Sequence, residues 1–522
     1  MSVPAQQPTE TPDDIRVLIT AAEVYPEMER AFLHAREEIH ASYRIFDLDT
    51  RLRTDEAREV GDTWFDLIVY KLRRGVKIRM VLSDFDPIMT AGLHGNTWRS
   101  MRAFIAASEA AGPGAPLELI AAIHPSRVGR PLRLVYWPFV RRRLKRILSG
   151  LNEKPEAERD AVLATMPGLR SHIKRGSDGS LQAIHWPPAD MLPGTHHQKI
   201  AVFDRQLLCI GGLDLDERRY DDKGHQRNRD ETWHDVQLMC SDPTLVAEAQ
   251  AHLETFLDVT AGLRKPEPAT RLLRTLSRKR KVTAPFIGPK PLVTELEQAH
   301  HDHVGRARGL IYLETQFFRD TALAERLARA AREKPELELI LVLPAAPEDI
   351  AFDGNRGADA RFGEYLQSRC LDTLEDAFGD RLAICSPVRP ETIGDTGRDS
   401  CAGSPIIYVH AKVSVFDTQS AIVSSANLNA RSLQWDTEAG IVLENSDTVA
   451  QLRRRAFAHW WREEEPPAEL CTPGKAAAAW RARCQENLAA RPEDRRGFLV
   501  PHDRKPAQKL GQWIPGLPEA IV

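Results

Sequence analysis

The sequence predicts an α/β protein built from two homologous halves whose mixed sheets surround one shared site. Three observations lead to this expectation. Hydrophobic residues recur at helical spacing and at strand spacing in alternation, this order of elements occurs twice, and one short motif is repeated with its flanks. Alternating helices and strands are typical of sheets covered by helices, and the second occurrence of the whole order indicates duplication.

The first half is expected to contain two helices and two strands in alternation. In chain order these are a helix over 24–39, a strand over 43–48, a helix over 63–74 that Gly75 is placed to end, and a strand over 76–82. The second half repeats the order with a helix over 292–304, a strand over 309–318, a helix over 321–333 and a strand over 337–343.

These elements divide the 522 residues into five segments. In order they are a disordered N-terminus (1–14), a first half (15–260) with an insertion at about 112–193, a basic linker (261–284), a second half (285–465) and a C-terminal tail (466–522). The N-terminus has neither the basic start nor the apolar segment of a Sec signal peptide. No apolar run approaches the roughly 18 residues needed to cross a bilayer. We therefore expect a cytoplasmic or peripheral membrane protein without a transmembrane segment, while secretion without a leader stays open.

Composition is that of a globular protein, with 42% hydrophobic and 28% charged residues. The net charge of −3 provides no overall positive field, so we do not expect a nucleic-acid partner. The seven cysteines are odd in number and lack CxxC spacing, which indicates free thiols.

The repeated motif is His-x-Lys followed after four residues by Asp. A separation of 213 residues joins His197 to His410, Lys199 to Lys412 and Asp204 to Asp417. The same separation aligns Gly211 and Gly212 with Ser424 and Ser425, and Asp214 with Asn427. One short motif can arise by chance, but two in a common frame with matching flanks indicate a shared origin.

The motif suits phosphodiester chemistry. Each copy leads into an apolar, β-prone segment, and residues two apart on a strand point to the same face, so each histidine should project beside its lysine. Cleavage of a phosphodiester needs a nucleophile on phosphorus, an acid for the leaving oxygen, and cations around the non-bridging oxygens. One half supplies only part of this set, so we expect both halves to meet around one phosphate.

The two motifs resemble the HKD motifs of the phospholipase D superfamily. Three further segments resemble the first catalytic half of plant and other eukaryotic-type phospholipases D: Gly211-Gly-Leu-Asp-Leu215, Arg219-Tyr-Asp221 and Trp233-His-Asp235. Five more resemble its second half: Ile311-Tyr-Leu-Glu-Thr-Gln-Phe-Phe318, Ile407-Tyr-Val-His410, Ser425-Ala-Asn-Leu-Asn429, Arg431-Ser-Leu433 and Asp436-Thr-Glu438. The resemblance covers about residues 15–465.

The chain departs from the family pattern at three points. There is no room before the first helix and strand for the calcium-binding C2 domain of the plant enzymes, so calcium dependence is not carried over. Ser424 stands where the family usually has Gly. Asp214 stands where many members have Asn, although the plant-like branch also has Asp there.

The resemblance implies a covalent mechanism and a role for each matching residue. His197 would attack phosphorus to form a phosphohistidine, and His410 would protonate the leaving alcohol. Lys199, Lys412 and Asn427 would stabilise the phosphoryl oxygens. The remaining candidates are Asp214 and Gln316 for substrate binding, with Glu314 as a weaker one, Asp235 and Glu438 for orienting the histidines, and Asp204 and Asp417 as motif members.

Two of these assignments have a competing interpretation. Asp204 and Asp417 end their strands, where Asp commonly forms turns, so a structural role is the alternative for both. His196 and His234 could join His197 as metal ligands, but no carboxylate cluster or HExxH spacing supports this. We therefore expect no metal and no cofactor.

The function expected from the resemblance is hydrolysis of phospholipid head groups to phosphatidic acid at a membrane surface, with transfer to other alcohols as a related activity. The alternatives are phosphatidyl transfer as in cardiolipin synthases, a nuclease, and a membrane-binding module without activity. The basic, aromatic stretch from Arg130 to Ile147 fits either an anionic membrane surface or a solvated helix. Because both halves lie in one chain, we expect a monomer.

Overall fold

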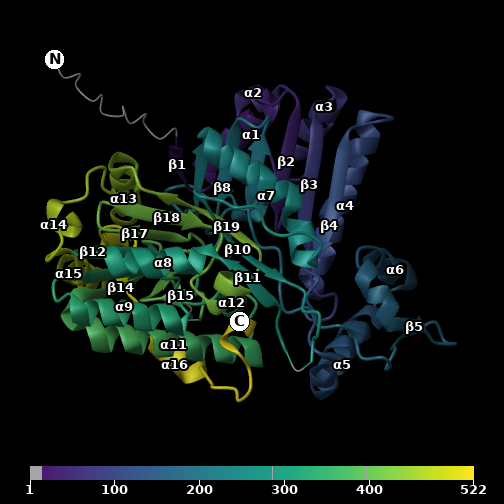
Figure 1. The fold of residues 1–522 in the computed structure, drawn as a ribbon. Helices are drawn as coiled ribbons and strands as arrows, with labels where there is room; N and C mark the ends of the chain where they lie inside the picture. Colours follow the sequence, from purple (N-terminus) through teal and green to yellow (C-terminus); the bar gives the residue numbers. More distant parts are fainter. Residues whose placement is uncertain (1–14, 285, 395–396) are drawn as a thin grey trace.

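The computed structural model describes residues 15–284, 286–394 and 397–522. The segment 1–14, which the sequence predicts to be disordered, lies outside the described residues. Two large mixed sheets dominate the fold, and in Figure 1 the first half lies toward the upper right and the second half toward the lower left.

The sheet of the first half has seven strands. In spatial order they are β1 (Ile15–Ile19), β9 (Val236–Cys240), β8 (Leu207–Gly211), β7 (Ile200–Phe203), β2 (Glu38–Tyr43), β3 (Lys77–Asp84) and β4 (Leu117–Ile123). The last three are parallel to one another, and the other neighbouring pairs are antiparallel.

The sheet of the second half has nine strands. In spatial order they are β11 (Lys290–Thr294), β10 (Leu272–Arg278), β19 (Glu438–Leu443), β18 (Ser420–Ser424), β17 (Val413–Phe416), β12 (Leu310–Glu314), β13 (Glu338–Val342), β14 (Leu382–Pro387) and β20 (Leu499–Pro501). The seven strands from β10 to β14 have the order and the directions of the seven strands of the first sheet. The predicted fold class, two related α/β halves with mixed sheets, is therefore confirmed.

Helices cover the outer faces of both sheets and fill the space between them. The outer face of the first sheet packs on α1 (Ala21–His34), α3 (Trp64–Arg73) and α4 (Ala91–Ala111), and that of the second on α8 (Glu295–Arg306), α9 (Thr321–Glu333) and α11 (Ala358–Phe378). Between the sheets lie α7 (Pro243–Ala261) and α13 (Ser446–Trp461), whose apolar residues join strands of both halves in one hydrophobic core. This continuous core fixes the position of one half against the other.

Most predicted elements lie where the sequence placed them, but the first strand does not. The helix expected over 24–39 ends at His34, and the strand is β2 rather than residues 43–48. The reason is a long-range contact, because the backbone N–H groups of Arg36, Glu37 and Glu38 all donate to the Asp204 carboxylate at 2.7–2.9 Å. This holds the chain extended before β2, whereas hydrophobic spacing alone lets the helix continue.

The expected insertion at about 112–193 begins with a strand of the sheet, because β4 pairs in parallel with β3. The rest forms a small subdomain around its own apolar cluster, made of α5 (Arg130–Asn152), α6 (Glu156–Ala164) and the hairpin β5 (Ile173–Arg175) and β6 (Leu181–Ala183). In Figure 1 this subdomain projects at the lower right.

Two segments without an expected strand contribute to the second sheet. Residues 261–284, expected as a basic linker, contain β10, and the C-terminal tail contributes β20 at the opposite edge. The tail also forms α14 (Ala468–Cys471), α15 (Ala476–Ala489) and α16 (Lys505–Leu510). The remaining short helices are α2 (Asp55–Arg58), α10 (Glu348–Ala351) and α12 (Ala430–Gln434). Among the described helices, none is long and apolar enough to cross a bilayer.

We expect the C-terminal tail to contribute directly to stability. Phe498 is fully buried, and its ring lies 5.3 Å from that of His225 and 6.0 Å from that of His459. Replacing Phe498 by Ala should lower the free energy of unfolding by about 3–5 kcal/mol, measured by urea denaturation. Leu488→Ala, at an exposed position of α15, is the control and should cost less than about 1 kcal/mol. Equal losses in the two variants would show that the tail is not part of the cooperative core.

Candidate active site

Each histidine of the repeated motif is hydrogen-bonded through its backbone to the opposite half. The His197 N–H donates to the Thr437 carbonyl at 2.8 Å, and the His410 N–H donates to the His234 carbonyl at 2.8 Å. Isolated bridges join the preceding residues to the same partners, so the two crossings are equivalent. The backbone that joins the halves is thus the backbone that carries the histidines.

The residue after each acceptor carbonyl holds the histidine ring. His197 Nδ1 lies 2.9 Å from Glu438 Oε1, and His410 Nδ1 lies 2.6 Å from Asp235 Oδ2. With the carboxyl group ionised, Nδ1 must carry the proton and Nε2 presents its lone pair. Neither Nε2 atom has a hydrogen-bond partner among the described residues. Each half therefore supplies one histidine and the carboxylate that orients the other.

Burial and neighbouring cations lower the pKa of both rings. Lys199, Arg44 and Lys412 lower the pKa of His197, and Lys412, Lys199 and His197 itself contribute to the lowered pKa of His410. Because each lysine acts on the histidine of the opposite half, the four motif side chains lie in one electrostatic environment. The His197 side chain is 13% exposed and that of His410 only 1%.

The pKa values of the two orienting carboxyl groups are raised, whereas those of the histidines are lowered. Burial raises the pKa of Glu438 to about 8, and it also raises the pKa of Asp235. Burial thus favours the protonated form of both carboxyl groups.

The two motif lysines, Lys199 and Lys412, have lowered pKa values and different neighbouring residues. Burial lowers the pKa of Lys199 to about 8 and that of Lys412 to about 7. Lys199 Nζ lies 3.7 Å from Asp214 Oδ2, whereas the repeat places the uncharged Asn427 at the position that corresponds to Asp214. Asp214 favours the protonated form of Lys199, and Asp235 favours the protonated form of Lys412.

Asp214 and Asn427, both expected to bind substrate, have different surroundings. Asp214 is fully buried, and its carboxylate accepts from the backbone N–H groups of Arg44 and Ile45 and from Arg219. This position supports a role in holding Lys199 and Arg219 rather than in contacting a substrate. Asn427 is also buried, but its Oδ1 has no partner within the described part of the chain, so its amide is available to a ligand.

Ser424, which stands where the family usually has Gly, has a glycine opposite it on the neighbouring strand. Ser424 pairs with Gly440 on β19, and a Cβ on Gly440 would lie 2.4 Å from that of Ser424. In the first half the small and large partners are exchanged, because Gly211 pairs with Gln237. The serine therefore fits without disturbing the sheet, and its neighbour Ser425 donates to Glu438 at 2.5 Å.

Asp204 and Asp417, expected among the catalytic residues, do not lie with the histidines and lysines. They follow β7 and β17, at the opposite ends of these strands from the His–Lys pairs. Asp417 accepts three backbone N–H groups, from Arg308, Gly309 and Leu310, each at 2.8 Å. Asp204 makes the equivalent bonds before β2. The geometry favours the structural alternative for both aspartates.

Gln316 and Glu314 have buried side-chain partners other than the motif histidines His197 and His410. Gln316 Nε2 donates to the Tyr408 hydroxyl at 2.7 Å, so among the described residues its side-chain hydrogen bond is to Tyr408 rather than to a motif residue. Glu314 is fully buried and accepts from Trp460 Nε1 at 2.7 Å, and its Oε2 lies 3.0 Å from His234 Nε2.

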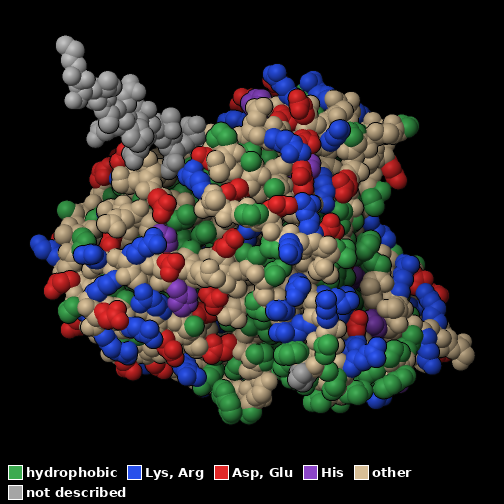
Figure 2. All heavy atoms as spheres, in the orientation of Figure 1, with side chains coloured by type: hydrophobic (Ala, Val, Ile, Leu, Met, Phe, Trp, Pro, Cys, Tyr) green, Lys and Arg blue, Asp and Glu red, His purple; other side chains and the backbone are tan. Residues whose placement is uncertain are grey.

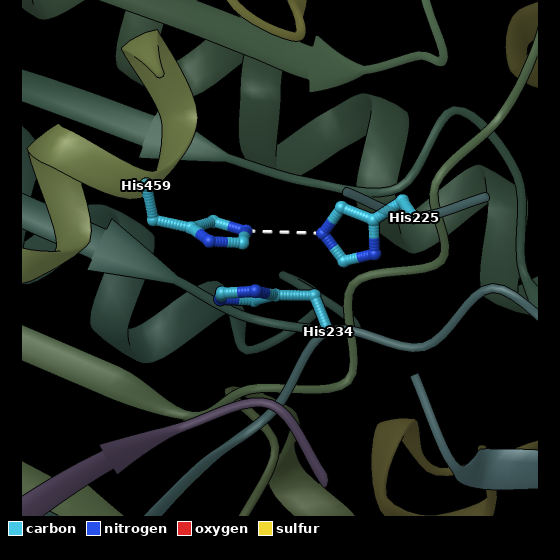
Figure 3. Close-up of side chains that lie close together, drawn as sticks. All are labelled: His225, His234 and His459. Carbon is cyan, nitrogen blue, oxygen red and sulfur yellow. Dashed lines mark hydrogen bonds between the residues drawn. The ribbon is translucent and has the colours of Figure 1, made fainter. Parts of the chain in front are cut away.

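Glu314 contacts His234, which belongs to a buried cluster of three histidines. The cluster consists of His225, His234 and His459 and is shown in Figure 3. Among the described residues this is the group that could hold a metal ion. Nε2 of His225 and Nε2 of His459 face each other at 3.0 Å, which is hydrogen-bond distance. Asp221 Oδ2 lies 2.6 Å from His225 Nδ1. The arrangement is that of a hydrogen-bonded chain of side chains.

The metal alternative considered from the sequence does not match the positions of its residues. His196 Nδ1 bonds to the Thr437 hydroxyl at 2.8 Å, and the His196 ring packs against His124 and Phe256. His196 therefore lies apart from the buried cluster that contains His234.

Three residues around the histidines have no role in the sequence-based prediction. Arg44, directly after β2, and Arg431 both lower the pKa of His197. The Trp233 ring lies 4.7 Å from the His410 ring. Arg44 would have been a candidate if β2 had been placed correctly, because it follows the carboxyl end of a strand beside the motif strand β7.

A cavity of about 450 Å³ lies close to this group. Its charged lining residues come from both halves and are Arg218, Arg229, Asp230, Glu348, Asp353 and Asp399. A series of ring contacts connects His410 to the cavity wall. The His410 ring contacts Trp233, Trp233 contacts Tyr408, and Tyr408 contacts Phe352, which lines the cavity.

Comparison with known proteins gives consistent matches. A family model described as the cardiolipin synthase, PLD-like domain matches residues 301–461. Phospholipase D zeta 1 of Arabidopsis thaliana is 26% identical over 31% of this chain and 17% of its own length. Phospholipase D1 of Rattus norvegicus is 24% identical over 30% and 16%, and phospholipase D1 of Saccharomyces cerevisiae is 23% identical over 49% and 20%. The matched part of this chain thus spans a fifth or less of these relatives.

A solved structure shares the fold over nearly the whole chain. Phosphatidylserine synthase of Haemophilus influenzae superposes with a TM-score of 0.51 over 92% of this chain and 95% of its own. The identity is 11%, so this likeness concerns the fold alone.

The position of Asp417 leads to a prediction that separates structure from catalysis. Asp417→Ala removes the acceptor of three backbone N–H groups and should lower the free energy of unfolding by about 2–4 kcal/mol, measured by urea denaturation. Turnover of the folded variant should fall by less than about tenfold. The control is Asp380→Ala, which removes only an exposed ion pair with Arg481 and should leave stability unchanged. Normal stability with a large loss of turnover would instead favour a catalytic role for Asp417.

Proposed function

Because this chain is a member of the phospholipase D superfamily, we propose that it is a phosphodiesterase that removes phospholipid head groups and leaves phosphatidic acid. The observation that carries the proposal is the pair of histidines with free Nε2 atoms, each held at Nδ1 by a carboxyl group of the opposite half. Two buried lysines beside them supply the positive charge that a phosphoryl group requires.

The first step requires the two His–carboxyl pairs to be in different protonation states. Nε2 of His197 attacks phosphorus while the bond from phosphorus to the head-group oxygen breaks, and Nε2–H of His410 gives its proton to that oxygen. The pair of His197 and Glu438 must therefore have lost its extra proton, and the pair of His410 and Asp235 must have kept one. The products are a phosphatidyl group bound to His197 and the free head-group alcohol.

The second step restores the enzyme. Nε2 of His410 removes a proton from water, the water oxygen attacks phosphorus, and the bond from phosphorus to His197 breaks. Phosphatidic acid leaves, and both pairs return to their initial states. An alcohol can replace water in this step and gives a phosphatidyl alcohol, so hydrolysis and transfer share the same intermediate.

Relatives of both kinds support keeping transfer as the alternative function. The relatives with sequence matches carry the name phospholipase D, whereas the family model names cardiolipin synthase and the solved structure is a phosphatidylserine synthase. A nuclease of the same superfamily is a further alternative, which the net charge of −3 disfavours.

The charged cavity favours a substrate with a cationic head group. Four carboxylates and two arginines line it, and Arg218 pairs with Glu348 at 2.6 Å while Arg229 pairs with Asp399 at 3.4 Å. Asp230 and Asp353 have no ion-pair partner among the described residues. The cavity is therefore net negative and includes the aromatic ring of Phe352, a combination suited to an ammonium group.

Activity should depend on pH through groups with opposite requirements. Glu438 must be ionised to keep Nε2 of His197 unprotonated, so activity should rise with pH toward its pKa of about 8. Lys412 must be protonated, so activity should fall as pH rises through its pKa of about 7. The profile of kcat/KM should be bell-shaped with its maximum near neutral pH. Lys412→Arg retains its charge to a much higher pH, so the residual activity of this variant should decline at higher pH than in wild type. If the alkaline decrease in kcat/KM occurs at the same pH in Lys412→Arg as in wild type, Lys412 is not the group that causes it.

The proposed function is tested by incubation with phosphatidylcholine and ethanol. We expect phosphatidic acid and phosphatidylethanol as products, and activity that persists after treatment with a chelator. His197→Ala and His410→Ala should each lower kcat by roughly 10³-fold. His34→Ala, at the exposed end of α1, is the matched control and should retain full activity. Near-normal turnover in either active-site variant would contradict the mechanism, and cleavage of DNA without turnover of lipid would select the nuclease.

A further inference from the structure

We propose that the insertion of the first half docks this protein on an anionic membrane surface. The docking face consists of the outward side of α5, Trp186 and the segment 278–286, apart from residue 285, which the structure does not describe. This inference deepens the proposed function, because a phospholipid-cleaving enzyme must reach its substrate at an interface.

Exposed apolar side chains are concentrated on this face. Val135 is 70% exposed, Phe139 55% and Leu134 52%, and Trp186 and Val282 are 71% and 70% exposed. With Phe286, these are six of the eleven large hydrophobic side chains that are exposed in the described part of the chain. Such a concentration is a recognised mark of a binding surface.

The three parts of the face adjoin one another. The Gly129 N–H, just before α5, donates to the Phe286 carbonyl at 3.0 Å, and a Cβ on Gly129 would lie 2.5 Å from the Thr283 carbonyl oxygen. At the other side, α5 packs against β6, and Arg141 and Lys145 contribute to lowering the pKa of His185, the neighbour of Trp186. Figure 2 shows hydrophobic side chains gathered along the lower edge, with Lys and Arg beside them.

The helix itself is divided into a buried and an outward side. Val140, Leu144, Leu148 and Leu151 pack into the core of the insertion. The opposite side carries Val135, Phe139, Arg142 and Arg146, whose spacing of four, three and four residues places them in one row. The row is apolar in its first half and basic in its second half.

The charge of the helix selects the kind of surface. α5 contains seven Lys and Arg residues and no Asp or Glu, in a chain whose net charge is −3. Six of its basic residues form no ion pair with any described residue: Arg130, Arg141, Arg142, Arg143, Lys145 and Arg146. The same face includes the basic run 278–281, in which Arg280 lies 3.9 Å from the Phe286 ring.

Apolar side chains flanked by unpaired cations match the boundary between acyl chains and anionic head groups. The aliphatic and aromatic side chains would enter the boundary, while the arginines remain at the level of the phosphates. A nucleic acid would use the cations but would leave Val135, Leu134 and Val282 exposed to water.

The docking face lies at the end of the first sheet that carries the active site. β4 leads through His124 to α5, and it runs parallel to β2, whose carboxyl end lies beside His197. Arg431 contributes to lowering the pKa of both His124 and His197, so its charge reaches both regions. Docking through α5 would therefore bring this end of the molecule toward the lipid.

The test is co-sedimentation of the full chain with vesicles. Wild type should bind vesicles of phosphatidylcholine containing roughly one quarter phosphatidylglycerol, more weakly at high salt and more weakly to phosphatidylcholine alone. Two double variants test the two parts of the row: Val135→Ser with Phe139→Ser, and Arg142→Gln with Arg146→Gln. Each should bind these vesicles at least about tenfold more weakly than wild type. Leu263→Ser is the control, because this side chain is 80% exposed outside the face, and it should bind as wild type.

The outcomes distinguish docking from catalysis. Wild-type binding by both double variants, or an equal loss in the Leu263→Ser control, would overturn the docking face. Circular dichroism verifies that each variant is folded, and turnover of a soluble short-chain phospholipid by the double variants should equal that of wild type. Binding to vesicles without turnover of any lipid would refute the proposed function and leave docking intact.

Discussion

The exchanged hydrogen bonds between His197 and Glu438 and between His410 and Asp235 are the interactions on which the active site depends. Neither half contains both members of a pair, so docking that buried a histidine without the carboxyl group of the other half would leave both groups unpaired. Unpaired buried polar groups are costly. Formation of the site is therefore coupled to docking of the halves, which the continuous core around α7 and α13 stabilises. The same contact that completes the fold also orients both imidazoles.

Duplication gives two equivalent sets of groups, and a few substitutions make the sets chemically different. Asp214 beside Lys199 is replaced by the uncharged Asn427 in the second half, so the two lysines have different neighbours. His197 is more exposed than His410. These differences suit a reaction in which one His–carboxyl pair must be deprotonated while the other holds a proton. A symmetric fold can thus support two different roles without different backbones.

The proposed catalysis and the proposed docking involve different parts of the molecule. The motif histidines and lysines are held by paired strands and buried hydrogen bonds, whereas Asp204 and Asp417 hold the backbone at the far ends of β7 and β17. The insertion after β4 adds no side chain to the histidine pairs, but it carries four of the exposed large hydrophobic side chains and the basic residues of α5. Its attachment at the carboxyl end of β4 is what relates this surface to the site.

The sequence alone determined the duplication, the α/β class and the choice of the motif histidines and lysines as candidate site residues, because these depend on local periodicity and on a repeat that can be counted along the chain. It did not determine the start of β2, since the three N–H groups before that strand are held by Asp204, more than 160 residues away. It also could not show that the Asp214 carboxylate accepts hydrogen bonds from Arg219 and from the backbone, or that α5 has an outward row of apolar and basic residues. Burial, pairing across the halves and side-chain exposure arise only when distant segments pack together, and so only the tertiary structure decided them.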